Sequence, residues 1–401
     1  MSNVAHLITG TGRLLLPEPY AGRTPWAVAV SGGTISWLGA LADAPPADAP
    51  AVDLGDALVT PGLVDAHSHP VFAGDRSDEA AARLAGEPYG GGGILRTVAA
   101  TRAADDEELE SLVEGRLRAQ LAAGTTTVEC KSGYGLSIED ELRALRIVGR
   151  VAQRLPLRVV RTFLGAHAVP AEAASPEAYV SEVVEHMLPA VADEGLAAFC
   201  DVFCDRGFFS VEAAERVLRA AADRGLGLRI HADQLSRTGA AELGVRLGAT
   251  SIDHLEQLDD AGIAALAGAD TVATLLPGPS LVLRDRRPPA RALLDAGVTV
   301  ALASDANAGT FGAFGAMPLV IGLGATLLDM RIDEALAAAT AGGAASLRLD
   351  ATCGALRRGM TADLVAWDAA HEGAFALRLG AVRARRVLVG GQDVTPDPTA
   401  P

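Results

Sequence analysis

Eight apolar segments, separated by longer helical stretches, constrain the fold of this chain more than any other feature of its sequence. The segments are rich in Val, Ile, Leu and Thr without strict polar alternation, which is typical of parallel strands buried on both faces. They span residues 62–67, 125–130, 157–167, 197–203, 226–232, 250–255, 270–276 and 298–305. Helices are predicted between them, for example at residues 105–122, 137–152, 211–224 and 288–296. Eight strand–helix units between residues 61 and 353 predict an α/β fold, a TIM-like (β/α)8 barrel.

The two ends of the chain have a different pattern, with short β-like runs and turns between them. WAVAV and TISWLG, separated by a serine-glycine-glycine turn, predict a hairpin near the N-terminus. DLVAWD and RVLVGG predict further strands near the C-terminus, after an Ala/Gly-rich stretch at 340–353 that is predicted to be helical. We interpret residues 1–60 and 354–401 as one small composite β-sandwich domain, with the barrel of residues 61–353 inserted between its halves.

Composition and charge limit the partners of this 401-residue chain and the compartment in which we expect it. Hydrophobic residues make up 49% of the chain, yet no apolar run reaches the roughly 18 residues of a membrane helix. The first residues lack the basic and apolar regions of a signal peptide, so we expect a cytoplasmic protein. A net charge of −16 argues against nucleic acid and anionic membranes as partners. The four cysteines form no C-x2-C pair, so neither a structural zinc site nor disulfides are expected.

Five of the eight histidines lie at the ends of predicted barrel strands. They are His67 and His69 after the first strand, His167 after the third, His231 after the fifth and His254 after the sixth, and Asp305 ends the eighth. The carboxyl ends of the strands form the rim that carries the active site in barrels of this kind. The clustering therefore predicts one functional site at this rim.

His67 and His69 are two positions apart, so both rings point to the same side of an extended segment. With His231 and Asp305 from other strands, they predict a site for one divalent or trivalent metal ion, Zn or Fe. Such an ion would activate water and polarise a carbonyl group, and a general base would take the water proton. Asp305 and His254 are the candidates for this base. His254 could instead stabilise an oxyanion or be a core histidine held by hydrogen bonds.

Other side chains on the predicted rim could bind a substrate. Arg76 could hold a carboxylate with two hydrogen bonds, or form a surface salt bridge with a neighbouring aspartate. Tyr134 lies between two glycines and could point into a pocket or occupy an ordinary turn. His167 could contact the substrate or be a core histidine. Gln234 cannot act as a base, so we expect it to form hydrogen bonds with the substrate.

Two features near the rim suggest other chemistry less strongly. Lys131 could be a carbamylated lysine that bridges two metal ions, but such a lysine usually lies on another barrel strand. The glycine run at 89–94 lacks the Gly-Lys-Ser/Thr ending of a phosphate-binding loop, so we interpret it as a flexible active-site loop.

Several further motifs follow one another along the chain. They are LVTPGLVDAHSH, GGGI, GTTTVECKSGYGL, FLGAHAVP, DVFC, IHADQ, the DHL segment, TVATLLPG and ADLVAWD. Together they resemble the imidazolonepropionases, a family in the amidohydrolase superfamily, over essentially the whole chain. The combination of KSGYGL, GAHA and HADQ is much more specific than the H-x-H pair, which occurs across the superfamily.

The resemblance implies hydrolysis of the imidazolone ring of 4-imidazolone-5-propanoate to N-formimino-L-glutamate in histidine catabolism. It implies one Zn or Fe ion, held by residues matching His67, His69, His231 and Asp305. It also implies substrate or product contacts by Arg76, Tyr134, His167, Gln234, Asn307, Gly309 and Thr310. Our hypothesis for catalysis is that Asp305 takes a proton and later protonates the leaving nitrogen, while His254 stabilises the oxyanion. Family members are commonly homodimers, and we expect the same here.

The chain departs from the family pattern after the last predicted strand. Residues 305–315 read DANAGTFGAFG, where the family more often has an N-P-G-S-S-like run, so Ala308 replaces a proline and Phe311 a small polar residue. Gln234 also stands where some members have glutamate. These differences leave open a related amidohydrolase that acts on another lactam or heterocycle, as a cyclic amidase or a deaminase. The third hypothesis, a non-catalytic metal-binding or sensor protein, is disfavoured by the candidate ligands, base and carboxylate-binding arginine.

Overall fold

A sheet of eight parallel strands lies at the centre of the computed structural model, which describes residues 4–15, 25–86 and 92–395. Each strand pairs with the next along the chain, in the order β13-β12-β11-β10-β9-β8-β7-β6. The strands are β6 (Leu63–Asp65), β7 (Thr125–Lys131), β8 (Arg158–Ala166), β9 (Phe199–Cys204), β10 (Gly227–Ala232), β11 (Ser251–His254), β12 (Val272–Leu275) and β13 (Val300–Leu302). They correspond one to one to the eight apolar segments of the sequence, which confirms the predicted barrel.

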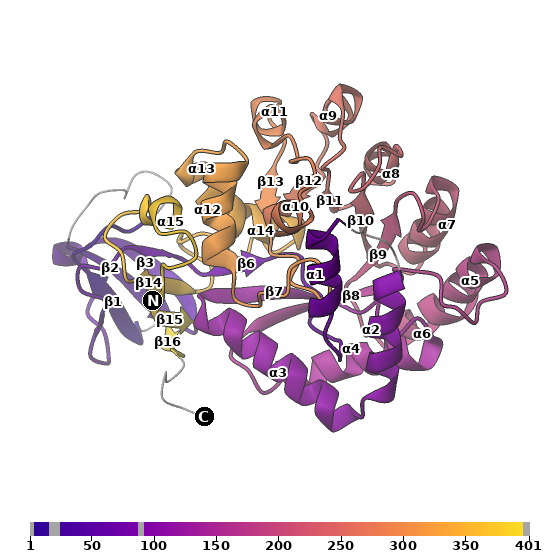
Figure 1. Cartoon of the computed structure of the whole chain (residues 1–401). Helices are drawn as coiled ribbons and strands as arrows, with labels where there is room; N and C mark the ends of the chain where they lie inside the picture. Colours follow the sequence, from indigo (N-terminus) through magenta and orange to yellow (C-terminus); the bar gives the residue numbers. More distant parts are fainter. Residues whose placement is uncertain (1–3, 16–24, 87–91, 396–401) are drawn as a thin grey trace.

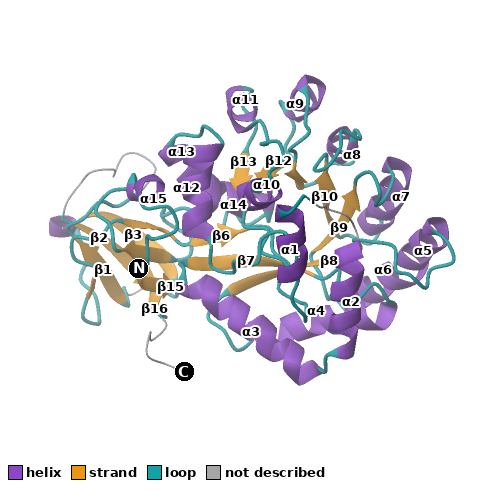
Figure 2. Ribbon diagram, in the orientation of Figure 1, coloured by secondary structure: helices purple, strands orange, loops and turns teal. Residues whose placement is uncertain are grey.

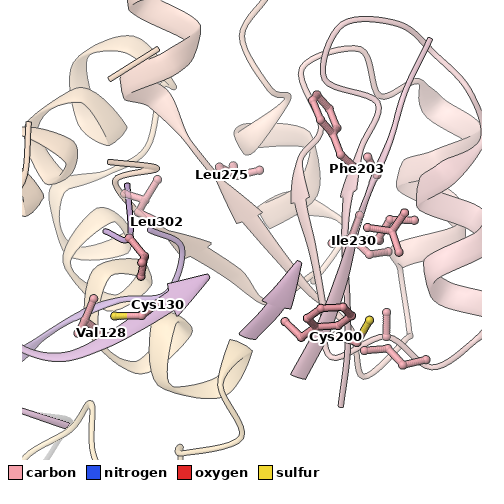
Figure 3. Close-up of a cluster of buried hydrophobic side chains, with 14 of the residues drawn as sticks. Val128, Cys130, Cys200, Phe203, Ile230, Leu275 and Leu302 are labelled. Carbon is pink, nitrogen blue, oxygen red and sulfur yellow. The ribbon is translucent and has the colours of Figure 1, made fainter. Parts of the chain in front are cut away.

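The barrel strands are apolar along their whole length because they are buried on both faces. Every residue of β7 and of β10 is buried. Figure 3 shows buried side chains from several strands, among them Val128 of β7, Cys200 of β9 and Leu302 of β13. The few charged residues inside these strands are therefore removed from water, and each needs a partner.

Helices lie around most of the barrel, and a short one lies beside the small sheets (Figures 1 and 2). They are α1 (Ser77–Leu84), α2 (Gly92–Ala103), α3 (Asp106–Ala122), α4 (Ile138–Ala152), α5 (Pro176–Glu182), α6 (Leu188–Asp193), α7 (Val211–Ala222), α8 (Ala240–Arg246), α9 (Asp260–Leu266), α10 (Pro277–Leu283), α11 (Ala290–Asp295), α12 (Met317–Leu327), α13 (Ile332–Ala337), α14 (Gly343–Ser346) and α15 (Ala374–Leu377). In α4 the Ser137 side chain caps the first turn by accepting from the backbone N–H of Asp140, and one face of the helix is buried. No helix in the described ranges is long and apolar enough to cross a membrane.

Two predictions of local structure need correction, one of a helix and one of a loop. The stretch 340–353 is only partly helical, because a π-helical segment (Ala338–Gly342) and α14 end at a left-handed residue, Arg348, with φ 57°. There the N–H of Leu349 donates to the carbonyl of Ala344 over 2.8 Å, which closes the helix end. The glycine run at 89–94 is not a loop throughout, since α2 already begins at Gly92. Residues 89–91 of that run lie outside the described residues.

Two small sheets contain the strands from both chain ends, which lie in one region of Figure 1. One sheet contains β1 (His6–Gly10), β2 (Trp26–Ser31), β3 (Thr34–Ala40) and β4 (Val52–Asp53), and the other contains β5 (Val59–Pro61), β14 (Leu364–Trp367), β15 (Ala384–Val389) and β16 (Gln392–Asp393). The predicted hairpin is β2–β3. Ile8 and Val28 from the N-terminal part share one buried cluster with Leu364 and Leu388 from the C-terminal part. The division into domains at residues 60 and 354 stays our interpretation.

Candidate active site

Three of the predicted metal ligands meet where the barrel closes. His67 and His69 follow β6, and Asp305 follows β13. The backbone N–H of Asp305 donates to the carbonyl oxygen of His67 over 2.9 Å. In the other direction, the N–H of His69 donates to the carbonyl oxygen of Ala306, also over 2.9 Å. A parallel bridge between Ser68 and Ala306 lies between them. Closure of the barrel therefore assembles this part of the site.

The side-chain atoms of these residues are spaced as ligands of one ion would be. Nε2 of His67 lies 3.3 Å from Nε2 of His69. Oδ1 of Asp305 lies 3.4 Å from Nε2 of His67 and 3.3 Å from Nε2 of His69. Ligand atoms held at about 2.0–2.1 Å from a tetrahedral zinc ion are separated by about 3.3 Å. The three residues therefore fit a shared metal ion.

His231 supplies another imidazole from β10. Its ring centroid lies 4.5 Å from that of His67. His67, His231 and His254 form one group whose ligand atoms lie within 4.8 Å of one another, and His67, His69 and Asp305 form another. Because His67 belongs to both groups, the four predicted ligands form one cluster, and His254 lies beside it. Imidazole nitrogens and a carboxylate oxygen form a donor set that suits Zn or Fe.

Two buried aspartates fix the orientation of the ligand rings. Nδ1 of His67 donates to Oδ2 of Asp253 over 2.7 Å, and Nδ1 of His231 lies 3.0 Å from Oδ2 of Asp201. A carboxylate accepts hydrogen bonds, so each ring donates from Nδ1 and turns Nε2 toward the ligand cluster. Burial raises the pKa of Asp253, but Arg229 and His67 outweigh burial and hold this pKa well below its usual range.

Lys131 and Arg229 balance the charge of these aspartates beneath the ligands. Nζ of Lys131 lies 2.6 Å from Asp201 and 2.8 Å from Glu129, and Arg229 lies 3.0 Å from Asp253. All five side chains are fully buried. Burial lowers the pKa of Lys131, but the charges of Asp201 and Glu129 outweigh it and raise this pKa. Lys131 is therefore an ammonium group paired with carboxylates.

The site predicted from sequence does not include the charged residues beneath the ligands, Glu129, Asp201, Arg229 and Asp253. Their positions in the sequence could have indicated them. A charged residue interrupts an otherwise apolar strand two positions before a predicted ligand or before another charged residue. Arg229 precedes His231 in β10, and Glu129 precedes Lys131 in β7. Residues two apart in a strand share a face, so these charges point toward the same side as their neighbours.

A small pocket lies beside the ligands. It is lined by His69, Arg76, Ile94, Tyr134, His167, Phe203, His231, Gln234, His254, Asp305, Asn307 and Thr310. The free space that the pocket leaves beside the ligands measures about 30 Å³. Nearly every predicted substrate-contacting residue lines this pocket, whereas Ile94 and Phe203 are additions that the structure makes.

Arg76 is buried and held by an acidic partner. Its Nε and Nη2 donate to the two carboxylate oxygens of Glu79 over 2.9 and 2.7 Å. Arg76 is 4% exposed, so this pair is not a surface salt bridge. A Cβ atom at Gly309 would lie 2.3 Å from Nη1 of Arg76, and one at Gly93 would lie 2.1 Å from its Nη2. The remaining predicted residue, Gly309, therefore provides the space into which the guanidinium group packs.

Two buried carboxylates hold the loops that carry Tyr134 and Gln234. Glu141 accepts hydrogen bonds from three backbone N–H groups of the Tyr134 loop, over 2.8–3.1 Å. Asp205 accepts from the backbone N–H of Gln234 over 3.0 Å and from that of the following residue over 2.7 Å. Both loops are thereby fixed by groups outside the pocket, which sequence reasoning did not identify.

His167 is held in one tautomer at the pocket wall. Its Nδ1 lies 2.8 Å from the carbonyl oxygen of Gly133, which can only accept a hydrogen bond. The proton therefore lies on Nδ1, and Nε2 is an acceptor. Burial, helped by nearby His69, lowers the pKa of His167 to about 3, so the ring is neutral at physiological pH. The ring of Tyr134 lies 5.2 Å from that of His167.

The loop after β13 is shaped by the amide of Asn307. Oδ1 of Asn307 accepts from the N–H groups of Gly309 and Thr310 over 2.7 and 2.9 Å, and its Nδ2 donates to Oγ1 of Thr310 over 2.7 Å. Phe311, one of the departures noted in the sequence, is buried against Gly278, whose added Cβ would lie 2.9 Å from the Phe311 ring. This loop therefore has its own internal support, and Phe311 packs against α10.

Comparison with known proteins shows the family. The amidohydrolase family model matches residues 58–394. An imidazolonepropionase from Salinispora arenicola is 48% identical over 395 residues, which cover 98% of this chain and 97% of that protein. The chain belongs to the imidazolonepropionase family. An imidazolonepropionase from Nocardia farcinica is 45% identical over 95% of this chain and 96% of its own length.

Solved structures show the same fold at lower sequence identity. A zinc-bound adenosine deaminase from Xanthomonas campestris has a TM-score of 0.73 and 22% identity, covering 98% of this chain and 93% of that chain. A 5-methylcytosine deaminase from Klebsiella pneumoniae, liganded with 5-fluorocytosine, has a TM-score of 0.77 and 16% identity, covering 97% of both chains. This imidazolonepropionase family member therefore shares its barrel with enzymes that act on other heterocycles.

Proposed function

We propose that this chain opens the imidazolone ring of 4-imidazolone-5-propanoate with water, giving N-formimino-L-glutamate in histidine catabolism. Water adds to the ring carbonyl carbon, the bond from that carbon to its ring nitrogen breaks, and the nitrogen gains a proton. One observation carries the proposal: the buried Arg76 lines the same pocket as His69, His231 and Asp305. The substrate combines a carboxylate, which suits the arginine, with a cyclic amide, which suits the ligand cluster.

His67, His69, His231 and Asp305 would hold one Zn or Fe ion. Bound there, the ion supplies Lewis acidity, which polarises a carbonyl group and lowers the pKa of water. The chain contributes the ligand geometry. Asp253 and Asp201 accept hydrogen bonds from Nδ1 of His67 and His231, which leaves Nε2 of each ring to bind the ion.

The remaining pocket residues bind and orient the substrate. Arg76 holds the propionate carboxylate, because a guanidinium group can donate two parallel hydrogen bonds to it. His167 accepts a hydrogen bond at Nε2 from a ring N–H group, as its tautomer allows. Gln234 and Tyr134 hydrogen-bond the polar ring from the other loops. Asn307, Gly309 and Thr310 shape the side of the pocket near Arg76.

Asp305 moves the proton during ring opening. Burial raises the pKa of Asp305, but its hydrogen bonds with His67 and His69 outweigh burial and hold this pKa well below its usual range. Asp305 is therefore ionised, which is the form in which a carboxylate can take a proton from the attacking water and pass it to the leaving ring nitrogen. His254 lies next to it, with Nε2 4.0 Å from Oδ2 of Asp305.

The direct test is the absorbance loss of freshly generated 4-imidazolone-5-propanoate on addition of purified, metal-loaded protein. We expect a fast loss that a chelator abolishes, with N-formimino-L-glutamate as the product. No loss with a folded, metal-loaded protein would refute the assignment. Ammonia release from another heterocycle would then indicate that the loop after Asp305 has redirected the enzyme.

We also propose a homodimer in the cytoplasm with one metal ion per chain. The resemblance to the family supports this proposal. Metal analysis of the purified protein would distinguish Zn from Fe, and light scattering after gel filtration would give the oligomeric state.

A further inference from the structure

His254 and Glu256 face each other as a buried pair at the edge of the pocket. His254 is 1% exposed and Glu256 is 3% exposed. Nδ1 of His254 lies 3.5 Å from Oε2 of Glu256. Within the described residues, neither of these two atoms has a hydrogen-bond partner. A buried polar atom without a partner destabilises the folded chain, so each atom is placed to satisfy the other. Catalytic hydrogen bonds are often long before substrate binds and shorten in the complex.

The backbone at His254 and Leu255 adopts an unusual conformation that brings Glu256 close to Nδ1 of His254. His254 and Leu255 have φ angles of 82° and 71°, in the left-handed region that residues other than glycine rarely occupy. Such a conformation is strained and persists where the surrounding structure holds it. Here the N–H of Leu255 donates to the carbonyl oxygen of Ala232 over 3.1 Å. The turn brings the side chain two positions after His254 back to its Nδ1.

A serine from another element fixes the far side of the carboxylate. Oγ of Ser280, in α10, donates to Oε1 of Glu256 over 2.8 Å, and Ser280 is 3% exposed. With Oε1 engaged, Oε2 is the oxygen that faces His254. At the opposite end of the ring, Nε2 of His254 lies 4.0 Å from Oδ2 of Asp305. The row Ser280, Glu256, His254 and Asp305 therefore runs from α10 to the ligand cluster.

We propose that Glu256 is a positioning residue that holds His254 with its proton on Nδ1 and its Nε2 lone pair directed toward Asp305. A carboxylate accepts hydrogen bonds, so the Nδ1–H tautomer is the one that satisfies Glu256. In that tautomer Nε2 of His254 can accept a hydrogen bond and has no hydrogen to donate to an oxyanion. The role in turnover rests on the proposed function, whereas the tautomer itself does not.

The tautomer can be measured without substrate. Long-range 1H–15N correlation spectra of the zinc-loaded protein, with 15N-labelled histidine, distinguish Nδ1–H from Nε2–H rings. A His254→Gln variant assigns the His254 resonances. We expect an Nδ1–H ring in the unmodified protein, and a mixture or an Nε2–H ring in Glu256→Leu, whose side chain has no acceptor. An Nε2–H ring in the unmodified protein, or an unchanged tautomer in Glu256→Leu, would overturn the proposal.

Turnover of 4-imidazolone-5-propanoate provides the second readout. We expect Glu256→Leu to lower kcat about 100-fold with KM changed less than about threefold, because the ring loses its orientation but the substrate contacts remain. Glu256→Gln keeps an acceptor oxygen and should lose only about tenfold, so it tests the idea even if the leucine variant folds poorly. Asp259→Asn, a carboxylate-to-amide change at the cap of α9, is the matched control and should retain full activity. Full kcat in both Glu256 variants would contradict the proposal, as would a loss that appears only in KM.

The two readouts separate this proposal from the proposed function. If the unmodified protein does not hydrolyse the imidazolone, the proposed function fails, and the tautomer still decides whether Glu256 positions His254. If the protein is active but the tautomer is Nε2–H, the positioning proposal fails alone. Metal content measured on every variant shows whether a loss of activity comes instead from a lost ion.

Discussion

The backbone N–H of Asp305 donates to the carbonyl oxygen of His67 over 2.9 Å, so the last barrel strand is joined to the first at two of the candidate metal ligands. The two residues are 238 positions apart in the sequence (305 minus 67). Because this hydrogen bond and the ligand cluster share the same residues, the geometry of the site depends on barrel closure. A substitution that breaks the contact between the segments after β6 and β13 should therefore weaken metal binding before it unfolds the rest of the barrel.

Replacing Asp305 with asparagine should abolish most of the activity while the fold survives. The amide cannot take the water proton, and it is a weaker metal ligand, so we expect kcat to fall at least about 1000-fold. Steady-state kinetics, metal analysis and thermal unfolding check this prediction. Asp295→Asn makes the same chemical change on an exposed helix end and should behave like the unmodified protein. Normal turnover in Asp305→Asn would rule out Asp305 as base and ligand.

Adding one methyl group at Gly309 should weaken substrate binding. The new Cβ would lie 2.3 Å from Nη1 of Arg76, which Glu79 already holds, so the guanidinium group must move away. We expect KM to rise at least about tenfold with little change in kcat, because the lost contact is made equally before and during ring opening. Gly312→Ala is the matched control in the same loop, since its nearest neighbour lies 3.8 Å away. Equal KM values in the two variants would contradict the role given to Arg76.

Removing the charge of Lys131 should destabilise the protein strongly. Lys131→Met leaves the buried carboxylates of Glu129 and Asp201 without their shared partner, which costs about 3–5 kcal/mol in comparable pairs. The free energy of unfolding in urea measures the effect. Arg154→Met, which breaks exposed ion pairs with Glu110 and Glu114, should leave the free energy of unfolding almost unchanged. Similar losses in the two variants would show that the buried network has no special role.

Metal affinity should increase as the pH rises toward about 9. Burial lowers the pKa of His67, but the hydrogen bonds to Asp253 and Asp305 outweigh it and raise this pKa to about 9 in the metal-free chain. A raised pKa means that His67 holds a proton below that pH, and an ion must displace this proton to bind. The apparent affinity should therefore rise about tenfold per pH unit between about pH 7 and 9, with one proton released at this site. Titration against a competing chelator measures this slope, and a flat profile would contradict the prediction.

The fold and the ligand set could be predicted from sequence because both follow from local patterns. Continuous apolar runs identify strands buried on both faces, and the rim rule then places residues at their carboxyl ends together. His67, His69, His231 and Asp305 were found in this way, since each follows or ends such a run. The helix end at residue 348 was not predicted. Arg348 itself adopts the left-handed conformation that usually requires glycine, so no glycine in the sequence indicates this end.

Local patterns in the sequence predicted the barrel, the candidate ligand residues and the arginine that suits a carboxylate. The tertiary structure decided which buried charge meets which partner: Asp253 with His67, 186 positions away, Lys131 with Asp201, and Arg229 with Asp253. These pairings depend on how far each strand is shifted along its neighbour and on how the barrel closes. A sequence shows that a buried charge needs a partner, but only the arrangement of the strands in space determines which one lies within reach.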